Sequence, residues 1–275
     1  MLGKRAGGSM REVLSLIRAS WRTALSYRLS MVLSLVSLLV TVVPLFFVAR
    51  ALQPVMANSI ATQGGEYFGF LLVGMIAYSF LSTAVNSVPG VISSGISNGT
   101  LEALLGTRAS LSSLLVGLIG YKFLWTAIRA LVLLSAGLVL GVHLAWGQGL
   151  VAIVIIALIV LAYLPFGLVA AALVLAFRTT GPFPSAVLIL SGLLGGVYYP
   201  TTVIPSWIQR LSDVVPLTYG LRALRHTLLE GMPFSAVAGD VATLLGFVVL
   251  LTAVGLLALS EALHYARRTG TLAQY

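Results

Sequence analysis

Ionisable side chains are scarce in this sequence, and their spacing supports little chemistry. The 275 residues include seven acids, three histidines, two lysines and no cysteine. Neither lysine lies in a GxxxxGK pattern, so the chain has no phosphate-binding loop for ATP hydrolysis. No HExxH pattern occurs, no histidines and carboxylates cluster, and no GxSG-type serine shares an apolar segment with a histidine. We therefore predict no catalytic residue, no metal site and no cofactor held by this chain.

Lys122 and Arg129 are an exception, because both fall inside a long apolar segment. Their separation of seven residues places them on one face of a helix. If that face is buried, two cations within the membrane would attract an anionic or lipid-linked molecule. In the alternative interpretation Lys122 extends to the membrane interface, and Arg129 is paired or lines water.

The composition of the chain identifies its solvent. Hydrophobic residues make up 59% of the sequence and charged residues 8%, whereas a soluble domain is about a quarter charged. We predict an all-α integral membrane protein, because helices satisfy their backbone hydrogen bonds within the bilayer. Basic residues are concentrated before residue 29, where they suit anionic lipid headgroups better than nucleic acid.

Apolar runs predict six transmembrane helices. They are expected at Leu29–Ala49, Tyr67–Val88, Leu111–Val142, Leu150–Phe177, Pro184–Tyr199 and Ala236–Leu263. An even number puts both termini on one side of the membrane, and the excess of basic residues on that side places them in the cytoplasm. The predicted location is therefore the cell (inner) membrane.

The segments that flank these helices divide the chain further. Residues 1–9 are typical of a flexible tail, and residues 10–28 of a basic amphipathic helix in the membrane interface. Packing of that helix on a soluble partner is the alternative. The transmembrane domain then occupies residues 29–265, and residues 266–275 form a second cytoplasmic tail.

The fifth predicted helix is short, and the segment after it is unusual. Its 16 residues rise only ~24 Å as a helix, against about 30 Å of hydrocarbon. We therefore expect residues 200–231 to lie in the outer leaflet as re-entrant or interfacial helices, although an external loop with two amphipathic helices also fits. The expected outer gate combines helix-breaking prolines with aromatic residues suited to the headgroup region: Tyr198, Tyr199, Pro200, Pro205, Trp207 and Pro216.

Small residues on the fifth predicted helix permit a close helix contact. They follow the small-xxx-small spacing of membrane helix pairs and are Ser191, Gly192, Gly195 and Gly196. Contact between two copies of the chain and packing within one copy fit this pattern equally well.

The run SNGTLEALLGTRAS, residues 97–110, interrupts the apolar sequence between the second and third predicted helices. Asn98 or Thr100 is suited to cap a short helix, and Glu102 lies where the helix dipole favours an anion. The apolar stripe of this helix consists of Leu101, Leu104 and Leu105. A groove on a soluble partner would accept that stripe. A loop helix that lies on the bilayer is the alternative.

Two motifs, in this order, resemble the type-2 ATP-binding-cassette permeases, the family of drug and polysaccharide exporters. The run SNGTLEALLGTRASLSSLLVG is similar to the family's coupling-helix region, with its GTLE-like stretch. The run SGLLGGVYYPTTVIPSWIQRLSDVVPLTYGLRALRHTLLEG resembles the second hallmark, an aromatic-Pro pair followed by Pro-Trp and Pro-Leu-Thr-Tyr. Val215 stands where the family commonly has Asn. The resemblance extends from about Met10 to about Leu263.

The resemblance implies a permease subunit that exports a drug-like, lipid-linked or glycan substrate. A separate ATPase subunit would bind ATP and magnesium, and a second permease copy or homologue would complete the substrate path. A coupling helix at about 98–107 would contact the ATPase through Gly99, Thr100, Leu101, Glu102, Leu104 and Leu105. Independently of the resemblance, the cations Lys122 and Arg129 are candidates for the substrate path if their face is buried.

Two other functional classes stay open at this point. A stand-alone channel or secondary carrier would work without an ATPase. Ion-coupled carriers generally place carboxylates inside the membrane, whereas all seven acids here lie in tails, loops or helix ends. An intramembrane enzyme is disfavoured by the missing catalytic residues.

Overall fold

The protein is all-helical in the computed structural model, which describes residue 18 and residues 28–97, 111–177 and 179–268. Within this part of the chain five helices are long and apolar enough to cross a membrane. They are α2 (Arg28–Met56), α3 (Tyr67–Ser97), α5 (Leu111–Val139), α6 (Gly149–Phe177) and α10 (Phe234–Arg268). The shorter elements are η1 (Trp146–Gln148), α7 (Phe183–Leu194), η2 (Thr201–Val203), α8 (Ser206–Ser212) and α9 (Pro216–Leu228). The all-α prediction is confirmed.

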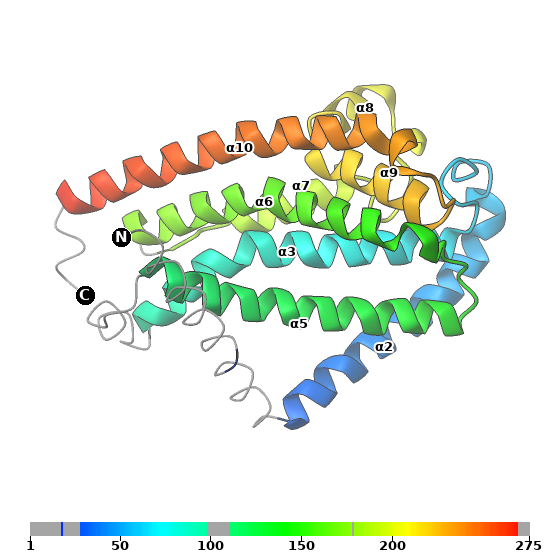
Figure 1. Ribbon diagram of the computed structural model, residues 1–275, viewed down its shortest axis with the longest axis horizontal. Helices are drawn as coiled ribbons and strands as arrows, with labels where there is room; N and C mark the ends of the chain where they lie inside the picture. Colours follow the sequence, from blue (N-terminus) through cyan, green and yellow to red (C-terminus); the bar gives the residue numbers. More distant parts are fainter. Residues whose placement is uncertain (1–17, 19–27, 98–110, 178, 269–275) are drawn as a thin grey trace, which may run out of the picture.

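Four of the long helices lie side by side, and α2 crosses beside them at an angle (Figure 1). α6 packs against both α3 and α10. α8 and α9 gather at one end of the bundle, near the start of α10 (Figure 1). The end of α3 at Ser97 and the start of α5 at Leu111 lie at the opposite end. The residues that flank segment 98–110 are therefore far from α8 and α9.

Two apolar clusters hold the described helices together. One joins α3, α6, α9 and α10 and includes the fully buried Tyr163 and Leu217. The other joins α2, α3 and α5 and includes Ile60 and Phe70. The Tyr163 hydroxyl donates to Oγ of Ser191 on α7 at 2.9 Å, so this buried polar group has a partner.

Glycines let α6 approach both of its neighbours closely. A Cβ at Gly167 on α6 would lie 2.6 Å from the carbonyl oxygen of Ala84 on α3. A Cβ at Gly255 on α10 would lie 2.8 Å from Cβ of Pro165 on α6. Both distances are shorter than ordinary non-bonded contacts, so the spacing of α3, α6 and α10 depends on these two glycines.

The fifth predicted transmembrane helix is the main correction. The sequence predicted a helix over Pro184–Tyr199, but α7 ends at Leu194, and its 12 residues rise only ~18 Å. The chain turns at Gly196, whose φ of 78° lies in the left-handed region that glycine adopts at little cost. The predicted count of six transmembrane helices is therefore not confirmed, since five of the described helices are long enough.

The other predicted helices are present, three of them with later ends and one with an earlier end: α10 continues past Leu263 to Arg268, and α5 ends at Val139 rather than Val142. α2 continues past Ala49 to Met56, and α3 continues past Val88 to Ser97 with Pro89 inside it. A proline within a membrane helix is tolerated where neighbouring segments satisfy the freed carbonyl group. Three predicted parts lie largely or wholly outside the described residues: the tail 1–9, the interfacial helix 10–28 and the C-terminal tail 266–275.

Replacement of Gly167 by alanine tests the close contact between α3 and α6. The added methyl group would press on the Ala84 carbonyl, and we expect a loss of about 1–3 kcal/mol in folding stability, as in other overpacked cores. Thermal unfolding of the purified protein in mild detergent measures this loss. Gly246→Ala on α10 is the matched control, because nothing lies within 4 Å of the added Cβ. Equal unfolding temperatures for the two variants would contradict the close approach.

Candidate functional site

A line of polar side chains lies between α3 and α5. The Lys122 ammonium group on α5 donates to the backbone carbonyl of Ser87 on α3 at 3.3 Å. One helical turn further along α5, the hydroxyl oxygens of Thr126 and Thr83 lie 2.7 Å apart. We call these contacts, with the polar side chains near them on the two helices, the polar seam: Ser82, Thr83, Asn86 and Ser87 on α3 and Lys122, Thr126 and Arg129 on α5. Asn86 bonds Ser82 within α3, and only Thr83–Thr126 and Lys122–Ser87 link the two helices among these residues.

Arg129 lies at the middle of the apolar stretch Ile119–Val139 and is exposed. No group among the described residues forms a hydrogen bond or ion pair with it. A cation that faces lipid at mid-membrane costs about 2.5–3.5 kcal/mol or more. Lys122, by contrast, is partly buried. The two predicted cations therefore share one helix, but the face that carries them is not buried as a whole.

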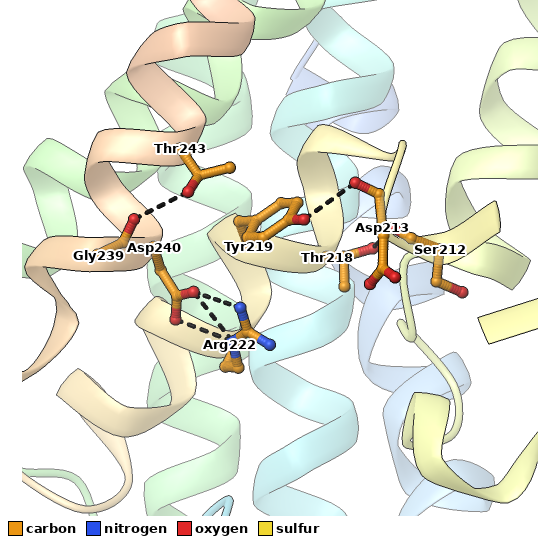
Figure 2. Close-up of polar contacts among 8 residues, drawn as sticks. All are labelled: Ser212, Asp213, Thr218, Tyr219, Arg222, Gly239, Asp240 and Thr243. Carbon is orange, nitrogen blue, oxygen red and sulfur yellow. Dashed lines mark hydrogen bonds and ion pairs between the residues drawn. The ribbon is translucent and has the colours of Figure 1, made fainter. Parts of the chain in front are cut away.

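The elements that follow α7 form a cap, residues 195–230, at one end of the bundle. Figure 2 shows how α9 is fixed within it. The Thr218 hydroxyl donates to the carbonyl of Ser212 at 2.7 Å, and the Tyr219 hydroxyl donates to the carbonyl of Asp213 at 3.0 Å. These two bonds hold the start of α9 against the end of α8.

An exposed ion pair attaches the cap to α10. Nε of Arg222 on α9 donates to both carboxylate oxygens of Asp240, at 3.0 and 2.9 Å, and a second guanidinium nitrogen bonds the same carboxylate (Figure 2). The pair is bidentate, but its arginine side chain is 46% exposed. Solvent-exposed pairs contribute only about 0–1 kcal/mol, so the Arg222–Asp240 pair adds little stability.

A buried arginine joins the cap to the rest of the bundle. Arg225 on α9 is 2% exposed. One of its terminal nitrogens donates to the carbonyl groups of Gly196 at 2.8 Å and Val197 at 3.3 Å, both in the turn after α7. The same nitrogen lies 3.2 Å from the carbonyl oxygen of Phe70, near the start of α3. The other terminal nitrogen donates to Oε1 of Gln63 at 3.3 Å. Arg225 thus connects four separate parts of the chain.

No carboxylate among the described residues pairs with Arg225. Carbonyl dipoles and the Phe70 ring, whose centre lies 3.3 Å from the guanidinium carbon, surround the charge instead, and Nε has no hydrogen-bond partner. The charge of this buried group therefore depends on neutral acceptors that must stay in place.

Sequence reasoning treated Arg225 as one more basic residue of an amphipathic helix and missed its burial. The signal is nevertheless present in the sequence. Leu217, Leu221 and Leu224 are fully buried on α9, and Arg225 lies four residues after Leu221 on the same face. Arg222 lies off that face. A charge on the apolar stripe of a helix predicts a buried and specifically bonded group.

The predicted outer-gate residues lie in the cap, but they differ in exposure. The carbonyl of Tyr198 accepts a hydrogen bond from the Tyr67 hydroxyl at 2.8 Å, which adds a second link between the turn after α7 and α3. The exposed members are Tyr198, Pro205 and Trp207. The partly or fully buried members are Tyr199, Pro200 and Pro216. Their role as a gate stays a prediction.

The small residues of α7 and its turn have neighbours within the same copy of the chain. Ser191 accepts the hydrogen bond from Tyr163, and a Cβ at Gly192 would lie 3.1 Å from the ring of Tyr78. The other two small residues, in the turn that Arg225 binds, are Gly195 and Gly196. A contact between two copies through these four residues stays a prediction.

The predicted coupling helix at about 98–107 lies outside the described residues. The same holds for its expected contact residues, which are Gly99, Thr100, Leu101, Glu102, Leu104 and Leu105. Its neighbours in the chain, at the end of α3 and the start of α5, lie at the end of the bundle opposite the cap (Figure 1).

The seam and the cap offer cations, hydroxyl groups and carbonyl groups. Such groups bind and orient a polar molecule by hydrogen bonds and charge. In the part of the chain that the structure describes, no three side chains are grouped to hold a metal ion. The polar groups of the seam and the cap are therefore of kinds that bind a polar molecule without covalent chemistry.

The two arginines on α9 give a direct comparison of buried and exposed cations. Arg225→Met would leave several buried carbonyl groups without their donor, and we expect a loss of about 2–4 kcal/mol in stability, since each unsatisfied buried group costs about 1–3 kcal/mol. Arg222→Met removes a solvent-exposed pair and should cost about 1 kcal/mol or less. Thermal unfolding in mild detergent measures both. If Arg222→Met is the more damaging change, the cap is not anchored by Arg225.

Comparison with known proteins identifies the family of this chain. Residues 11–229 match the family model described as ABC-2 type transporter. Linearmycin resistance permease protein LnrN from Bacillus subtilis (strain 168) is 25% identical over 181 residues, which make up 66% of this chain and 46% of that protein. The aligned part thus spans about half of the relative's length. Because the family model covers most of the chain, this protein belongs to the ABC-2 type transporter family and is a non-catalytic membrane permease.

Proposed function

We propose that this chain is the membrane subunit of an ATP-driven exporter in which two permeases enclose a substrate path. Permeases of this family work with ATPase subunits, and such a subunit would bind ATP and magnesium for this chain. The chain would cross the cell membrane six times, with α7 and the cap together forming the fifth crossing. Both termini would then face the cytoplasm, and the cap would lie in the outer leaflet.

The observation that carries this proposal is the exposed Arg129 at mid-membrane. A cation that faced lipid chains there would be costly, whereas a water-filled path or a second permease copy would remove that cost. The polar seam extends the same surface along α3 and α5. We infer that the seam faces the substrate path.

The substrate class follows from the charge of the seam. No carboxylate of the described residues neutralises Lys122 or Arg129, so the seam favours an anionic or lipid-linked substrate. The printed name of the Bacillus relative refers to resistance to linearmycin, which supports a drug-like compound as one candidate. A glycan that carries a lipid phosphate would suit the same cations.

Coupling to the ATPase would occur through residues 98–107. The ends of α3 and α5 that flank this segment lie opposite the cap (Figure 1), as expected for a cytoplasmic contact beneath an outer cap. ATP binding would shift the equilibrium between the inward-facing and outward-facing states of the permease. The size of that shift is limited by the difference in the affinity of the ATPase pair for the two states. A rigid contact at the coupling helix would convert that preference into movement of α3 and α5.

Reversal of the charge at Glu102 tests the coupling contact. We expect Glu102→Arg to lose most of the ATPase subunit that the tagged wild-type chain retains, about tenfold or more, because a charge-assisted hydrogen bond contributes about 1.5–3 kcal/mol. The measurement is a mild-detergent pull-down from native membranes, with ATPase quantified by mass spectrometry.

Asp213→Arg is the matched control for this experiment, since it makes the same charge reversal on an exposed residue of the cap. Equal retention by both variants would place the ATPase contact elsewhere. A folded wild-type chain that brings down no ATPase would instead favour a stand-alone channel or secondary carrier.

Neutralisation of the seam tests the substrate path. We expect Lys122→Gln with Arg129→Gln to weaken resistance of a sensitive host to anionic amphiphiles about tenfold, and to leave resistance to neutral ones unchanged, because only the anionic compounds lose a charge partner. Growth inhibition with the permease and its ATPase co-expressed gives the readout. Arg210→Gln, an exposed cation of α8, is the control. A uniform loss for anionic and neutral compounds would argue against a charge-selective path.

A further inference from the structure

A small cavity lies beside the second half of α2, away from the polar seam. Its volume is about 280 Å³. Drug-sized ligands generally occupy about 300–1,000 Å³, so this cavity suits one polar headgroup better than a whole amphiphile. It is lined by Phe46, Ala49, Arg50, Gln53, Glu66, Phe68 and Leu140.

Two opposite charges line this cavity without neutralising each other. Arg50 is exposed, and its guanidinium carbon lies 5.8 Å from the centre of the Phe46 ring. Glu66 is partly buried just before α3. In the described part of the chain neither charge forms an ion pair. Partial burial raises the pKa of the Glu66 carboxyl group, and the nearby His143 opposes that rise. The cavity thus offers a cation and an anion that are both open to a ligand.

The position of Glu66 is fixed by its neighbours. The Gln53 side chain donates to the carbonyl of Gly65 at 2.7 Å and accepts from the backbone N–H of Tyr67 at 2.7 Å. The Gln53 side chain therefore holds the backbone of Gly65 and Tyr67, the residues before and after Glu66. The Phe46 and Phe68 rings meet edge to face, with centres 5.1 Å apart and planes at 84°, and form an apolar wall. The backbone on both sides of Glu66 and the aromatic wall are thus in place before a ligand arrives, which lowers the entropy cost of binding.

An apolar stripe on α2 leads to this cavity. The side chains of Val36, Val40, Val43 and Phe47 recur at three- and four-residue intervals and are between 46% and 65% exposed. Arg50 continues the same stripe three residues after Phe47. A hydrocarbon chain along the stripe would therefore end at the cavity, with its polar end beside Arg50.

We propose that the cavity binds the headgroup of a zwitterionic phospholipid of the phosphoethanolamine type. The lipid phosphate would accept hydrogen bonds from the Arg50 guanidinium, which is suited to bidentate contact with phosphate. The primary ammonium would donate to the Glu66 carboxylate and lie against the aromatic wall, where a cation meets the faces of rings. The acyl chain would lie along the stripe on α2. This site is separate from the proposed substrate path and does not depend on which end of the bundle faces outward.

A lipid-binding measurement on the purified full chain tests the proposal. The probe is lysophosphatidylethanolamine with a lauroyl chain, added to protein in mild detergent, and native mass spectrometry quantifies the bound fraction. We expect Arg50→Gln and Glu66→Gln each to weaken binding roughly tenfold, since each loses one charge-assisted contact. The double exchange of Arg50→Glu with Glu66→Arg should recover part of the loss. Arg210→Gln and Asp213→Asn, exposed charges of the cap, should bind like the wild type.

Two further probes on the wild-type chain identify the ligand even if a variant folds poorly. Lysophosphatidylcholine has the same phosphate and chain but no N–H donor for Glu66, and we expect it to bind about tenfold more weakly. Free phosphoethanolamine lacks the chain and should bind more weakly still. Equal binding of the ethanolamine and choline lipids would overturn the headgroup assignment. Equal binding of the free and lipid-linked headgroups would overturn the lipid. Unchanged binding in both charge variants would remove the site.

Discussion

Lipid offers no hydrogen-bond partner, so each polar group inside this bundle must be satisfied by the chain itself. That requirement explains why the described residues form helices, and why the sites where helices stop are the most heavily bonded. At the turn after α7 the backbone carbonyls of Gly196 and Val197 have no helical partners, and the Arg225 guanidinium supplies the missing donors. At the start of α3 the N–H of Tyr67 is equally unpaired within its helix, and Gln53 from α2 accepts it.

The same requirement reverses the usual meaning of exposure. On a soluble protein an exposed arginine needs no explanation, and a buried one does. Here both need one. Arg225 is buried because it completes the backbone of another segment, so its role is structural. Arg129 is exposed at mid-membrane with no partner among the described residues, so its partner is expected outside this copy of the chain. Burial thus separates an anchoring cation from one suited to function.

The sequence predicted the long helices well because their signal is length and hydropathy, and neither depends on tertiary contacts. It failed at Pro184–Tyr199, where apolar residues continue through Val197 although the helix ends at Leu194. The end is set by Gly195 and Gly196 and by a buried arginine about thirty residues later, a long-range contact that no local pattern reports. Only the α5 side of the polar seam could be predicted from the sequence. Lys122 and Arg129 were visible as charges in an apolar run, whereas Thr83 on α3 belongs to the seam only through its contact with Thr126 on α5.

α3 is a single helix of 31 residues, which is about 46 Å long. Phe70 near its first turn carries the carbonyl and the ring that hold Arg225, and Ser97 at its last turn borders the segment expected to meet the ATPase. Because α3 is continuous, a displacement at one end would be transmitted to the other end. Pro89 is the position inside the helix where it could bend. Pro89 lies eight residues before Ser97, so a movement that enters α3 at Ser97 would have to pass this proline before it reaches the cap.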